Sequence, residues 1–354
     1  MNTILKTTRE QKGLRLREVA NKMRIDQALI SKFESGSRIP NRQQVLDLAD
    51  TLDIPVQQLL AEWIKEKIKR EIGNDGQYVP EIWALLERGS MPLLNEPAAP
   101  YAGFAAELER LDSLKAKLNN IRLKEYNRIE EALELEYTFE SNRIEGNTLT
   151  LQETDLVVKQ GLTISGKSMR EHLESINHQE AILFIKELAS SNSRIREGDV
   201  LALHNLILRG IDTRNAGRYR DVQVMISGSR HVPPASYLLS SMMGDFFNWL
   251  TEAEHTLHPV VLAAMAHERL VTIHPFTDGN GRTSRLLMNL TLLRNGFVIA
   301  NIKGDNASRM AYYKTLEQAQ SGGSDSAFIL LVIHQEIEAL ERYLRLTAGD
   351  DKIL

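Results

Sequence analysis

Residues 274–285 read HPFTDGNGRTSR and place one histidine, one acid, two glycines and two arginines within twelve positions. The stretch before them, HPVVLAAMAHERLVTI, has the apolar periodicity of an amphipathic helix. Pro275 disfavours helix in the residue before it, so this helix is expected to end at Ile273–His274. The residues after the glycines, RTSRLLMNLTLLRNG, have helical periodicity again. The stretch therefore predicts a loop that joins two helices.

Gly279, Asn280 and Gly281 would open the second helix. The first backbone N–H groups of a helix have no partner within it, and the positive end of the helix dipole lies there too. Such a helix start binds anions, and glycines let the backbone approach phosphate oxygens closely. We therefore expect a phosphate site, although the GK[ST] of a Walker loop is absent.

The charged side chains of the stretch fit the same ligand. Arg282 and Arg285 are three residues apart, so they share a helix face and could bind neighbouring phosphates. Asp278 offers hard oxygen ligands that suit Mg²⁺ beside phosphates. His274 titrates near neutrality and could take a proton from an incoming hydroxyl. This combination predicts phosphoryl or nucleotidyl transfer, and it argues against a histidine that only caps a helix beside solvated arginines.

HPFTDGNGRTSR resembles the signature of the Fic family, HPFx[DE]GNGRxxR, without a departure. The resemblance extends over roughly residues 100–340. Most characterised members transfer AMP from ATP to a protein hydroxyl and release pyrophosphate. The resemblance therefore implies a protein adenylyltransferase with ATP as co-substrate, Mg²⁺, and a Ser, Thr or Tyr side chain as acceptor.

The resemblance also implies a role for each motif residue. His274 would deprotonate the target hydroxyl, Asp278 would hold Mg²⁺ between the α- and β-phosphates, and Arg285 would hold the γ-phosphate. The remaining motif residues would contact the phosphates: Gly279, Asn280 and Gly281 as an anion hole, and Arg282 as a cation that steadies them.

Two further segments resemble parts of the same family. Residues 222–234, VQVMISGSRHVPP, alternate β-branched residues around a Gly-Ser turn, which predicts a small hairpin. In the family such a flap orients the target segment by strand addition, although an ordinary surface hairpin has the same pattern. Tyr312 and Tyr313, in MAYYKTL, fall where the family lines the adenine, although paired aromatics are also common in cores.

A second unusual stretch is TFESNRIEGNTLT, residues 138–150. Ser141 and Glu145 are four residues apart on one helix face, and Gly146 is a natural C-cap. An acid in the last turn opposes the helix dipole, so Glu145 should gain from a cationic partner. SNRIEG resembles the inhibitory motif [ST]xxxE[GN] of Fic proteins, which implies an inhibitory helix at about residues 130–146. There the glutamate would pair with Arg285 and block productive γ-phosphate binding.

Residues 13–40, GLRLREVANKMRIDQALISKFESGSRIP, predict two short helices with a tight turn, with Asp26 as N-cap of the second helix. Residues 5–60 resemble repressor-type (XRE/Cro-like) helix-turn-helix domains, whose second helix enters the major groove of DNA. The resemblance implies contacts to base edges from Gln27, Ala28, Ser31 and Lys32. It implies contacts near phosphates from Arg15, Arg17 and Arg38.

The charge distribution supports a polyanion as partner of this segment. Residues 1–42 hold ten Lys/Arg against four Asp/Glu, although the net charge of the 354 residues is −4. The alternative is a helical dimerisation module that no longer binds DNA. Repressor-type domains usually bind as dimers, so we expect a homodimer, with EWIKEKIKREIG as a possible interface.

The composition predicts a cytoplasmic protein without a membrane segment. Hydrophobic residues make up 42% and charged residues 25% of the chain, there is no cysteine, and no run of eighteen apolar residues occurs. We expect an all-α architecture with one projecting hairpin. The predicted parts are a helix-turn-helix domain at 1–63, a charged helix and a proline-containing linker at 64–100, and a Fic domain at 101–354.

The sequence leaves several readings of the function open. The first is an autoinhibited adenylyltransferase fused to a DNA-binding module. The second is a DNA-binding regulator whose Fic domain senses ATP. A third keeps the enzyme but lets it mainly remove AMP, with Glu145 aligning a water, or use another donor such as UTP. His267 lies seven residues before His274, and we expect it to be buried and hydrogen-bonded rather than a metal ligand.

Overall fold

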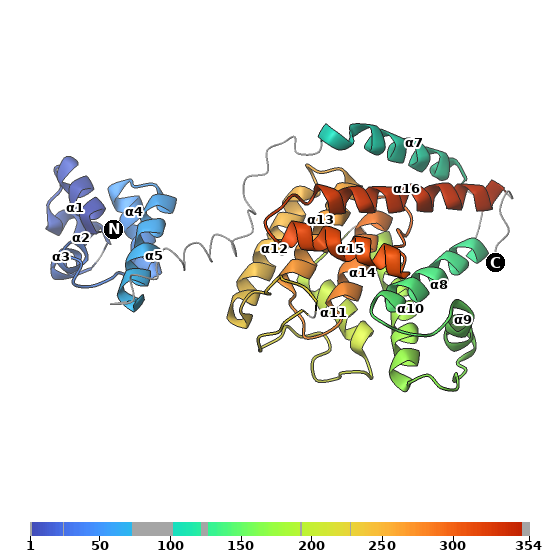
Figure 1. The fold of residues 1–354 in the computed structure, drawn as a ribbon. Helices are drawn as coiled ribbons and strands as arrows, with labels where there is room; N and C mark the ends of the chain where they lie inside the picture. The colour runs from blue at the N-terminus through green and yellow to red at the C-terminus, as the bar shows by residue number, and fades with distance from the viewer. Residues whose placement is uncertain are drawn as a thin grey trace. The chain divides into compact units, whose positions relative to one another are not determined.

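The two helices on either side of residues 274–279 are central in the larger part of the chain (Figure 1). They are α13 (Pro259–Ile273) and α14 (Asn280–Arg294), and twelve of the fifteen residues in each are buried. A helix that is buried on all sides belongs to the interior of a domain. The helices pack against each other, as the loop between them requires. This computed structural model thus places the predicted helix–loop–helix joint at the core.

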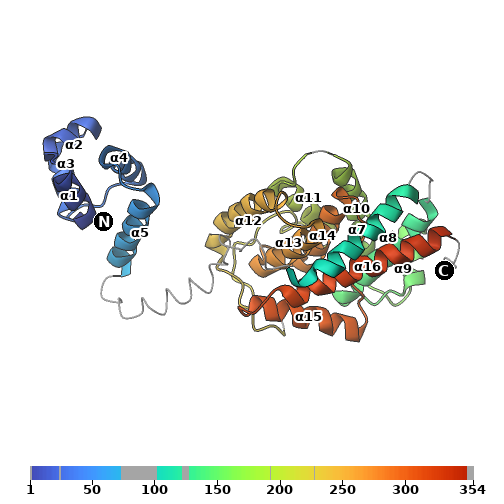
Figure 2. The same cartoon turned by 90° about the horizontal axis from the view of Figure 1, so that it is seen from above.

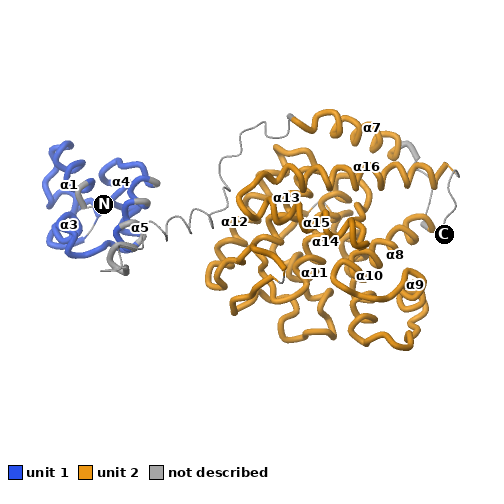
Figure 3. Tube along the Cα trace, viewed as in Figure 1, with its two compact units in different colours: residues 1–90 blue, residues 91–354 orange. Residues whose placement is uncertain are grey.

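The structure describes residues 2–23, 25–72, 102–121, 127–191, 193–226 and 228–348. The chain divides into two compact units, Met1–Ser90 and Met91–Leu354 (Figure 3). The linker predicted around MPLLNEPAAP lies outside the described residues.

The described part of the larger unit contains ten α-helices and two short 3-10 helices. In chain order they are η2 (Ala102–Phe104), α7 (Ala105–Ile121), α8 (Asn127–Ile144), α9 (Leu151–Gln160), α10 (Met169–Ser190), α11 (Glu197–Leu208), η3 (Ser236–Leu238), α12 (Leu239–Ala253), α13, α14, α15 (Asn306–Gln320) and α16 (Ser326–Ala348).

Other helices enclose the central pair. α10, α11 and α8 pack on α14, while α12, α15 and α16 pack on α13. α7 lies along α16 in both views (Figures 1 and 2). One apolar core runs through the unit, and residues of α13 and α14 form its middle. α8, which carries Ser141, is therefore held against the helix that carries Arg285.

The N-terminal unit has a core of its own, formed by the five helices described within residues 2–72. These are α1 (Asn2–Gln11), α2 (Leu16–Met23), α3 (Gln27–Glu34), α4 (Arg42–Leu52) and α5 (Val56–Ile72). The Asp26 side chain accepts from Ala28 N at 2.6 Å, so the predicted N-cap of α3 is confirmed. Trp63, in α5, donates to Pro40 O at 2.8 Å, so the charged helix predicted after residue 63 continues a helix that is anchored in this core.

The hairpin predicted at residues 222–234 is wrong, since the described residues contain no β-strand. Ser227, at the predicted turn, lies outside the described residues. Pro233 and Pro234 have no N–H to donate to a ladder, and side chains bridge the two arms instead. Gln223 Nε2 donates to Pro233 O at 2.8 Å, for example. The all-α prediction is otherwise confirmed over the part of the chain that the structure describes.

Among the described helices, none combines the length and the apolar content that crossing a membrane requires.

Candidate active site

The loop between α13 and α14 begins at His274, whose left-handed backbone (φ 50°, ψ 57°) ends α13 as predicted. Few residues other than glycine adopt this conformation, so the surrounding contacts must stabilise it. The Asn280 side chain closes the loop, because it accepts from Phe276 N at 3.0 Å and donates to Phe276 O at 2.8 Å. Asn280 was expected in an anion hole, and this arrangement leaves it only its backbone N–H for a ligand.

The imidazole of His274 is held in one tautomer. Its Nδ1 lies 3.2 Å from Val271 O, and because a carbonyl can only accept, Nδ1 carries the proton. Nε2 therefore carries the lone pair. Burial, with a smaller contribution from the nearby Arg220 charge, lowers the pKa of His274 to about 4. The ring is thus neutral at pH 7 and able to accept a proton.

His204, on α11, contacts the backbone and side chains of the loop between α13 and α14. Gly217 N donates to its Nδ1 at 3.0 Å, so Nε2 donates to Asp278 O at 2.9 Å. Its ring stacks on Phe276 at a centroid distance of 3.6 Å, and a Cβ on Gly279 would lie 3.3 Å from its Cδ2. Burial lowers its pKa to about 4. A neutral His204 therefore fixes the backbone of the loop.

Arg220 joins the loop to both arms of the segment 222–234. Its Nε donates to His274 O at 2.9 Å, its Nη1 to Val222 O at 2.9 Å, and its Nη2 to Pro234 O at 2.6 Å. The residue is 4% exposed. One guanidinium thus takes the place of the predicted ladder and positions the backbone of His274 at the same time.

Asp278 lies in a ring of charges. Its Oδ1 accepts from Gly279 N at 2.6 Å and its Oδ2 from Arg170 Nη2 at 2.6 Å. Arg282 is 2% exposed and lies between two carboxylates, with Nη1 3.3 Å from Glu174 Oε1 and Nη2 3.6 Å from Asp278 Oδ1. Burial opposes ionisation of Asp278, but Arg282, the Gly279 N–H and Arg170 together lower its pKa. Asp278 is therefore ionised, as a metal ligand must be.

Arg285 is 1% exposed and points to the end of α8. Its Nη2 donates to Glu145 Oε1 at 2.6 Å and to Ser141 O at 2.9 Å, and its Nε donates to Ser141 Oγ at 3.1 Å. Burial opposes its charge, but the Glu145 carboxylate, together with Tyr312 and Tyr137, outweighs burial and raises the pKa of Arg285. Glu145 thus has the cationic partner predicted for it. Arg282 and Arg285, although three residues apart, contact different acids.

Gly281 shows where the Glu145 carboxylate lies. A Cβ on Gly281 would be 2.5 Å from Glu145 Oε1 and 3.2 Å from Arg285 Nη1. The carboxylate therefore lies directly against the first turn of α14, where free backbone N–H groups and the helix dipole favour an anion. An acidic side chain of the protein itself occupies the place where the sequence predicted a phosphate.

The end of α8 is fixed by contacts beyond this ion pair. Gly304 N donates to Glu140 Oε2 at 2.7 Å, and a Cβ on Gly304 would lie 2.8 Å from Glu140 O. The Tyr313 hydroxyl donates to Ile144 O at 3.2 Å. Only a glycine permits so close an approach, so the last two turns of α8 are held tightly against the segment before α15.

The two tyrosines predicted near an adenine have different surroundings. Tyr312 is 1% exposed, accepts from Arg285 Nη1 at 3.3 Å, and lies 3.0 Å from His267 Nε2. His267 is therefore buried and hydrogen-bonded, as expected. Tyr313 is 42% exposed, and of the two only its ring is accessible for stacking.

Both units of the chain match known families. Residues 194–292 match the Fic/DOC family, and residues 3–63 match a helix-turn-helix domain. The chain belongs to the Fic/DOC family. "Protein adenylyltransferase Fic" of Nematostella vectensis is 38% identical over 245 residues, which cover 68% of this chain and 56% of that protein. Fic-1 of Caenorhabditis elegans is 36% identical over 224 residues, covering 62% and 43%. The chain spans about half the length of the curated relatives it matches.

Solved structures show the same fold. A Fic-1 fragment of C. elegans aligns with a TM-score of 0.61 at 25% identity, over 95% of this chain and 98% of that one. A Fic-domain signalling protein of Bacteroides thetaiotaomicron aligns with a TM-score of 0.63 at 25% identity, over 70% and 98%. The likeness to Fic proteins thus extends beyond the residues that the family model matches.

In this Fic protein, the residues predicted to contact DNA are on the surface of the N-terminal unit. All seven are exposed, four of them on α3: Gln27, Ala28, Ser31, Lys32, Arg15, Arg17 and Arg38. Arg9, which lies before the motif at residues 13–40, binds Glu34 with Nε at 2.6 Å and Nη2 at 2.9 Å. This paired contact fixes α3 against α1.

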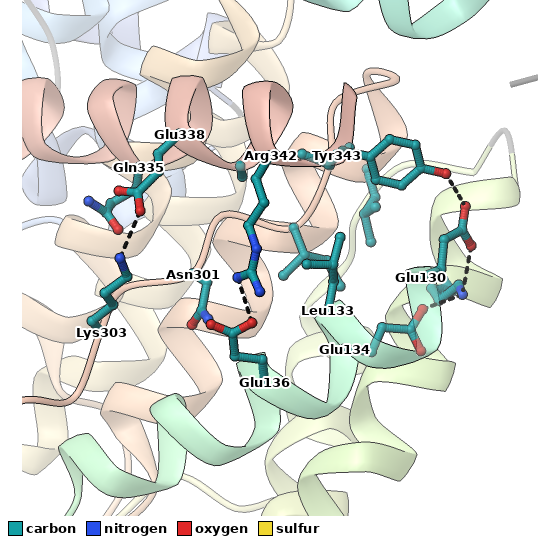
Figure 4. Close-up of a pocket in the computed structure, with 15 residues that line it drawn as sticks. Glu130, Leu133, Glu134, Glu136, Asn301, Lys303, Gln335, Glu338, Arg342 and Tyr343 are labelled. Carbon is teal, nitrogen blue, oxygen red and sulfur yellow. Dashed lines mark hydrogen bonds and ion pairs between the residues drawn. The ribbon is translucent and has the colours of Figure 1, made fainter. Parts of the chain in front are cut away.

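A pocket of about 790 Å³, part of it open to solvent, lies along residues 130–136 of α8, which precede Ser141 and Glu145 (Figure 4). α8, α16 and residues 298–303 line it, and none of the residues 274–285 does. Its charged groups pair with one another, for example Arg342 with Glu136 at 2.5 Å and Lys303 with Glu338 at 2.7 Å. Four glutamates and three basic residues line the pocket, so one negative charge remains in excess, and we assign the pocket no ligand.

Proposed function

We propose that this Fic protein is a protein adenylyltransferase that transfers AMP from ATP to a hydroxyl of a target protein. One observation carries the proposal: a neutral His274, an ionised Asp278 and the free N–H groups of α14 meet at a single loop. That is the combination of base, metal ligand and phosphate cradle that nucleotidyl transfer needs.

The geometry suggests the following course for the reaction. His274 Nε2 accepts the proton of the target hydroxyl, while Nδ1 remains bonded to Val271 O. The hydroxyl oxygen bonds to the α-phosphorus of ATP, and the bond from that phosphorus to the bridging oxygen breaks, so that pyrophosphate leaves. The backbone N–H groups at the start of α14 stabilise the negative charge on the phosphates.

A magnesium site fits the residues present. Asp278 offers hard carboxylate oxygens, and its side chain is 44% exposed. Mg²⁺ usually binds through one or two carboxylates together with substrate phosphates. The described residues hold no group of three or more metal-ligating side chains, so such a site would need the nucleotide to complete it. When bound, Mg²⁺ would neutralise charge on the phosphates.

We propose that Glu145 restrains this activity. Its carboxylate occupies the first turn of α14 and pairs with Arg285, the residue implied to hold the γ-phosphate. A second anion at this place is disfavoured by charge repulsion and by space. The chain would then bind ATP unproductively until Glu145 moves.

We propose one kind of partner for each of the two units, a target protein and DNA. Arg220 joins the segment 222–234 to the His274 loop, and three exposed apolar residues of that segment, Val222, Met225 and Val232, support docking of a target segment there. For the N-terminal unit we propose DNA binding by α3 as a homodimer, supported by the surplus of basic residues and the seven exposed positions.

Intact-mass measurement of wild type and Glu145→Gly after incubation with Mg-ATP tests the enzyme, with UTP and GTP in parallel. We expect an AMP adduct on the chain itself, or on a protein from a lysate of its host, that grows faster in Glu145→Gly and is abolished by adding His274→Ala. Tight ATP binding without any adduct in Glu145→Gly would instead favour the ATP sensor. An equal adduct without His274 would refute the assigned base.

A further inference from the structure

Arg170, at the start of α10, is a cation that neither the family signature nor the proposed reaction uses. Its guanidinium bridges two acids, since Nη2 donates to Asp278 Oδ2 at 2.6 Å and Nε donates to Glu174 Oε1 at 3.2 Å. Arg282 contacts the same two acids from inside the fold. Asp278, Arg170, Glu174 and Arg282 thus form a closed ring of alternating charges, which we call the Asp278 ring.

The two arginines of the Asp278 ring differ in their freedom to move. The side chain of Arg282 is 2% exposed, whereas that of Arg170 is 56% exposed. Arg170 can turn its Nη2 away from Asp278 into solvent and keep its bond to Glu174 through Nε. Arg282 has no such space. Of the two cations on Asp278, Arg170 is therefore the one that can leave.

The carboxylate of Asp278 cannot hold Arg170 and a second cation equally well. Mg²⁺ binds carboxylate oxygens at about 2.0–2.1 Å and demands near-ideal octahedral geometry. A guanidinium nitrogen 2.6 Å from Oδ2 occupies one side of that oxygen and repels a divalent cation. Once displaced, Arg170 lies beside the phosphates at the start of α14, and a guanidinium binds phosphate as it binds carboxylate.

We propose that Arg170 is a resident counter-cation of Asp278 that Mg²⁺ must displace, so that Arg170 sets the magnesium requirement of nucleotide binding. This inference rests on the proposed function, because it assumes that Asp278 holds Mg²⁺ beside a nucleotide. In the resting protein, charged side chains of the protein itself then occupy both the phosphate position and the metal position of the nucleotide site. Glu145 takes the place of a phosphate, and Arg170 takes the place of the metal ion.

Two effects of opposite sign distinguish this role from a merely structural one. Without Mg²⁺, Arg170 offsets the negative charge of Asp278 and so favours a phosphate ligand. With Mg²⁺, it competes with the ion. Arg170→Ala should therefore weaken nucleotide binding in the absence of Mg²⁺ and lower the Mg²⁺ concentration needed for tight binding. Because Arg170 is exposed by more than half, we expect each change to be about two- to fivefold.

Calorimetric titration of the full chain with ADP measures both effects. ADP carries the two phosphates between which Mg²⁺ would lie and lacks the γ-phosphate that Glu145 would oppose. ADP is titrated first with Mg²⁺ chelated and then at increasing MgCl₂. Lys159→Ala is the matched control, because it removes the same charge from α9, where Lys159 is half exposed and forms an ion pair with Asp155 of the same helix. We expect Lys159→Ala to bind as wild type does.

A double-mutant cycle ties the effect to Asp278. In an Asp278→Asn background, Arg170→Ala should no longer change the Mg²⁺ dependence, and Arg170→Lys in the wild-type background should behave more like wild type than Arg170→Ala does. Unchanged Mg²⁺ dependence in Arg170→Ala, or weaker binding at every Mg²⁺ concentration, would overturn the inference alone. No ADP binding by any of these proteins would overturn the proposed nucleotide site, and the inference with it.

Discussion

Replacing Gly281 by alanine tests where the Glu145 carboxylate lies, without need of a target protein or a nucleotide. Gly281 is the second residue of α14, and its φ lies outside the left-handed region, so alanine can adopt its backbone. The new Cβ would meet Glu145 Oε1 at 2.5 Å, which is too close for any real contact. Because that oxygen is the end of a flexible side chain, we expect the carboxylate to move away from Arg285.

The magnitude follows from two opposing contributions. Alanine in a helix is more favourable than glycine by roughly 0.5–1 kcal/mol. Loss of a hydrogen bond between charged groups costs about 1.5–3 kcal/mol, and the lower part applies because the Glu145 side chain is 31% exposed. We therefore expect Gly281→Ala to lower the free energy of unfolding by about 1 kcal/mol. In a Glu145→Ala background only the first contribution remains, and the same substitution should stabilise.

Differential scanning calorimetry of the full chain measures this change of sign. A change of 1 kcal/mol shifts the midpoint of a domain of this size by about 2–4 °C. The transition of the unit Met91–Leu354 should fall by that amount in Gly281→Ala and rise slightly when Glu145 is absent, while the transition of the N-terminal unit stays constant. Gly198→Ala, at the second position of α11 with open space around its Cβ, should stabilise in both backgrounds. Equal destabilisation by Gly281→Ala in both would refute the placement of the carboxylate.

Three further predictions concern the base, the loop and the DNA. Burial lowers the pKa of His274 to about 4, so the base stays neutral well below pH 6.5. The rate of AMP transfer by Glu145→Gly should therefore stay constant from pH 7 to about pH 5. A fall in the rate near pH 6.5 would contradict this. Arg220→Lys should raise the KM for a protein target at least severalfold, because lysine cannot bridge both arms of 222–234. Enzyme kinetics measure the KM, and calorimetry should show that ADP binding is unchanged. Gln27→Ala should reduce discrimination between operator sequences by about 1–3 kcal/mol. Arg17→Ala should instead weaken binding to all sequences and reduce the slope of log binding constant against log salt concentration by about one. Binding assays at several salt concentrations measure both effects.

Local rules explain the parts of the fold that the sequence predicted correctly. Pro275 ends α13 and Asp26 caps α3 through contacts within a few residues, which a pattern can reveal. The pairing of Glu145 with Arg285 spans 140 residues, and it was predictable because both belong to motifs that resemble those of one family.

The contacts that could not be predicted involve partners that no nearby sequence pattern indicates. Arg220 binds backbone carbonyls, and these have no sequence signature, so the alternation of 222–234 was interpreted as a ladder. Arg170 meets Asp278 across 108 residues. Its i, i+4 spacing from Glu174 was the one local signal, and such a spacing alone is typical of any exposed helix.

The tight contact between Gly304 and the end of α8 has a consequence for the kinetics of restraint. Because the helix cannot shift without opening that contact, Glu145 must leave Arg285 by rotation of its own side chain. Rotamer changes take picoseconds to nanoseconds, whereas movements of packed helices take microseconds to milliseconds. A restraint of about 1.5–2 kcal/mol, the lower part of the range used above for this pair, would leave roughly one molecule in ten to thirty open at any moment. Resting molecules would thus leak at a steady low rate, and any activating signal would act by prolonging an opening that already occurs.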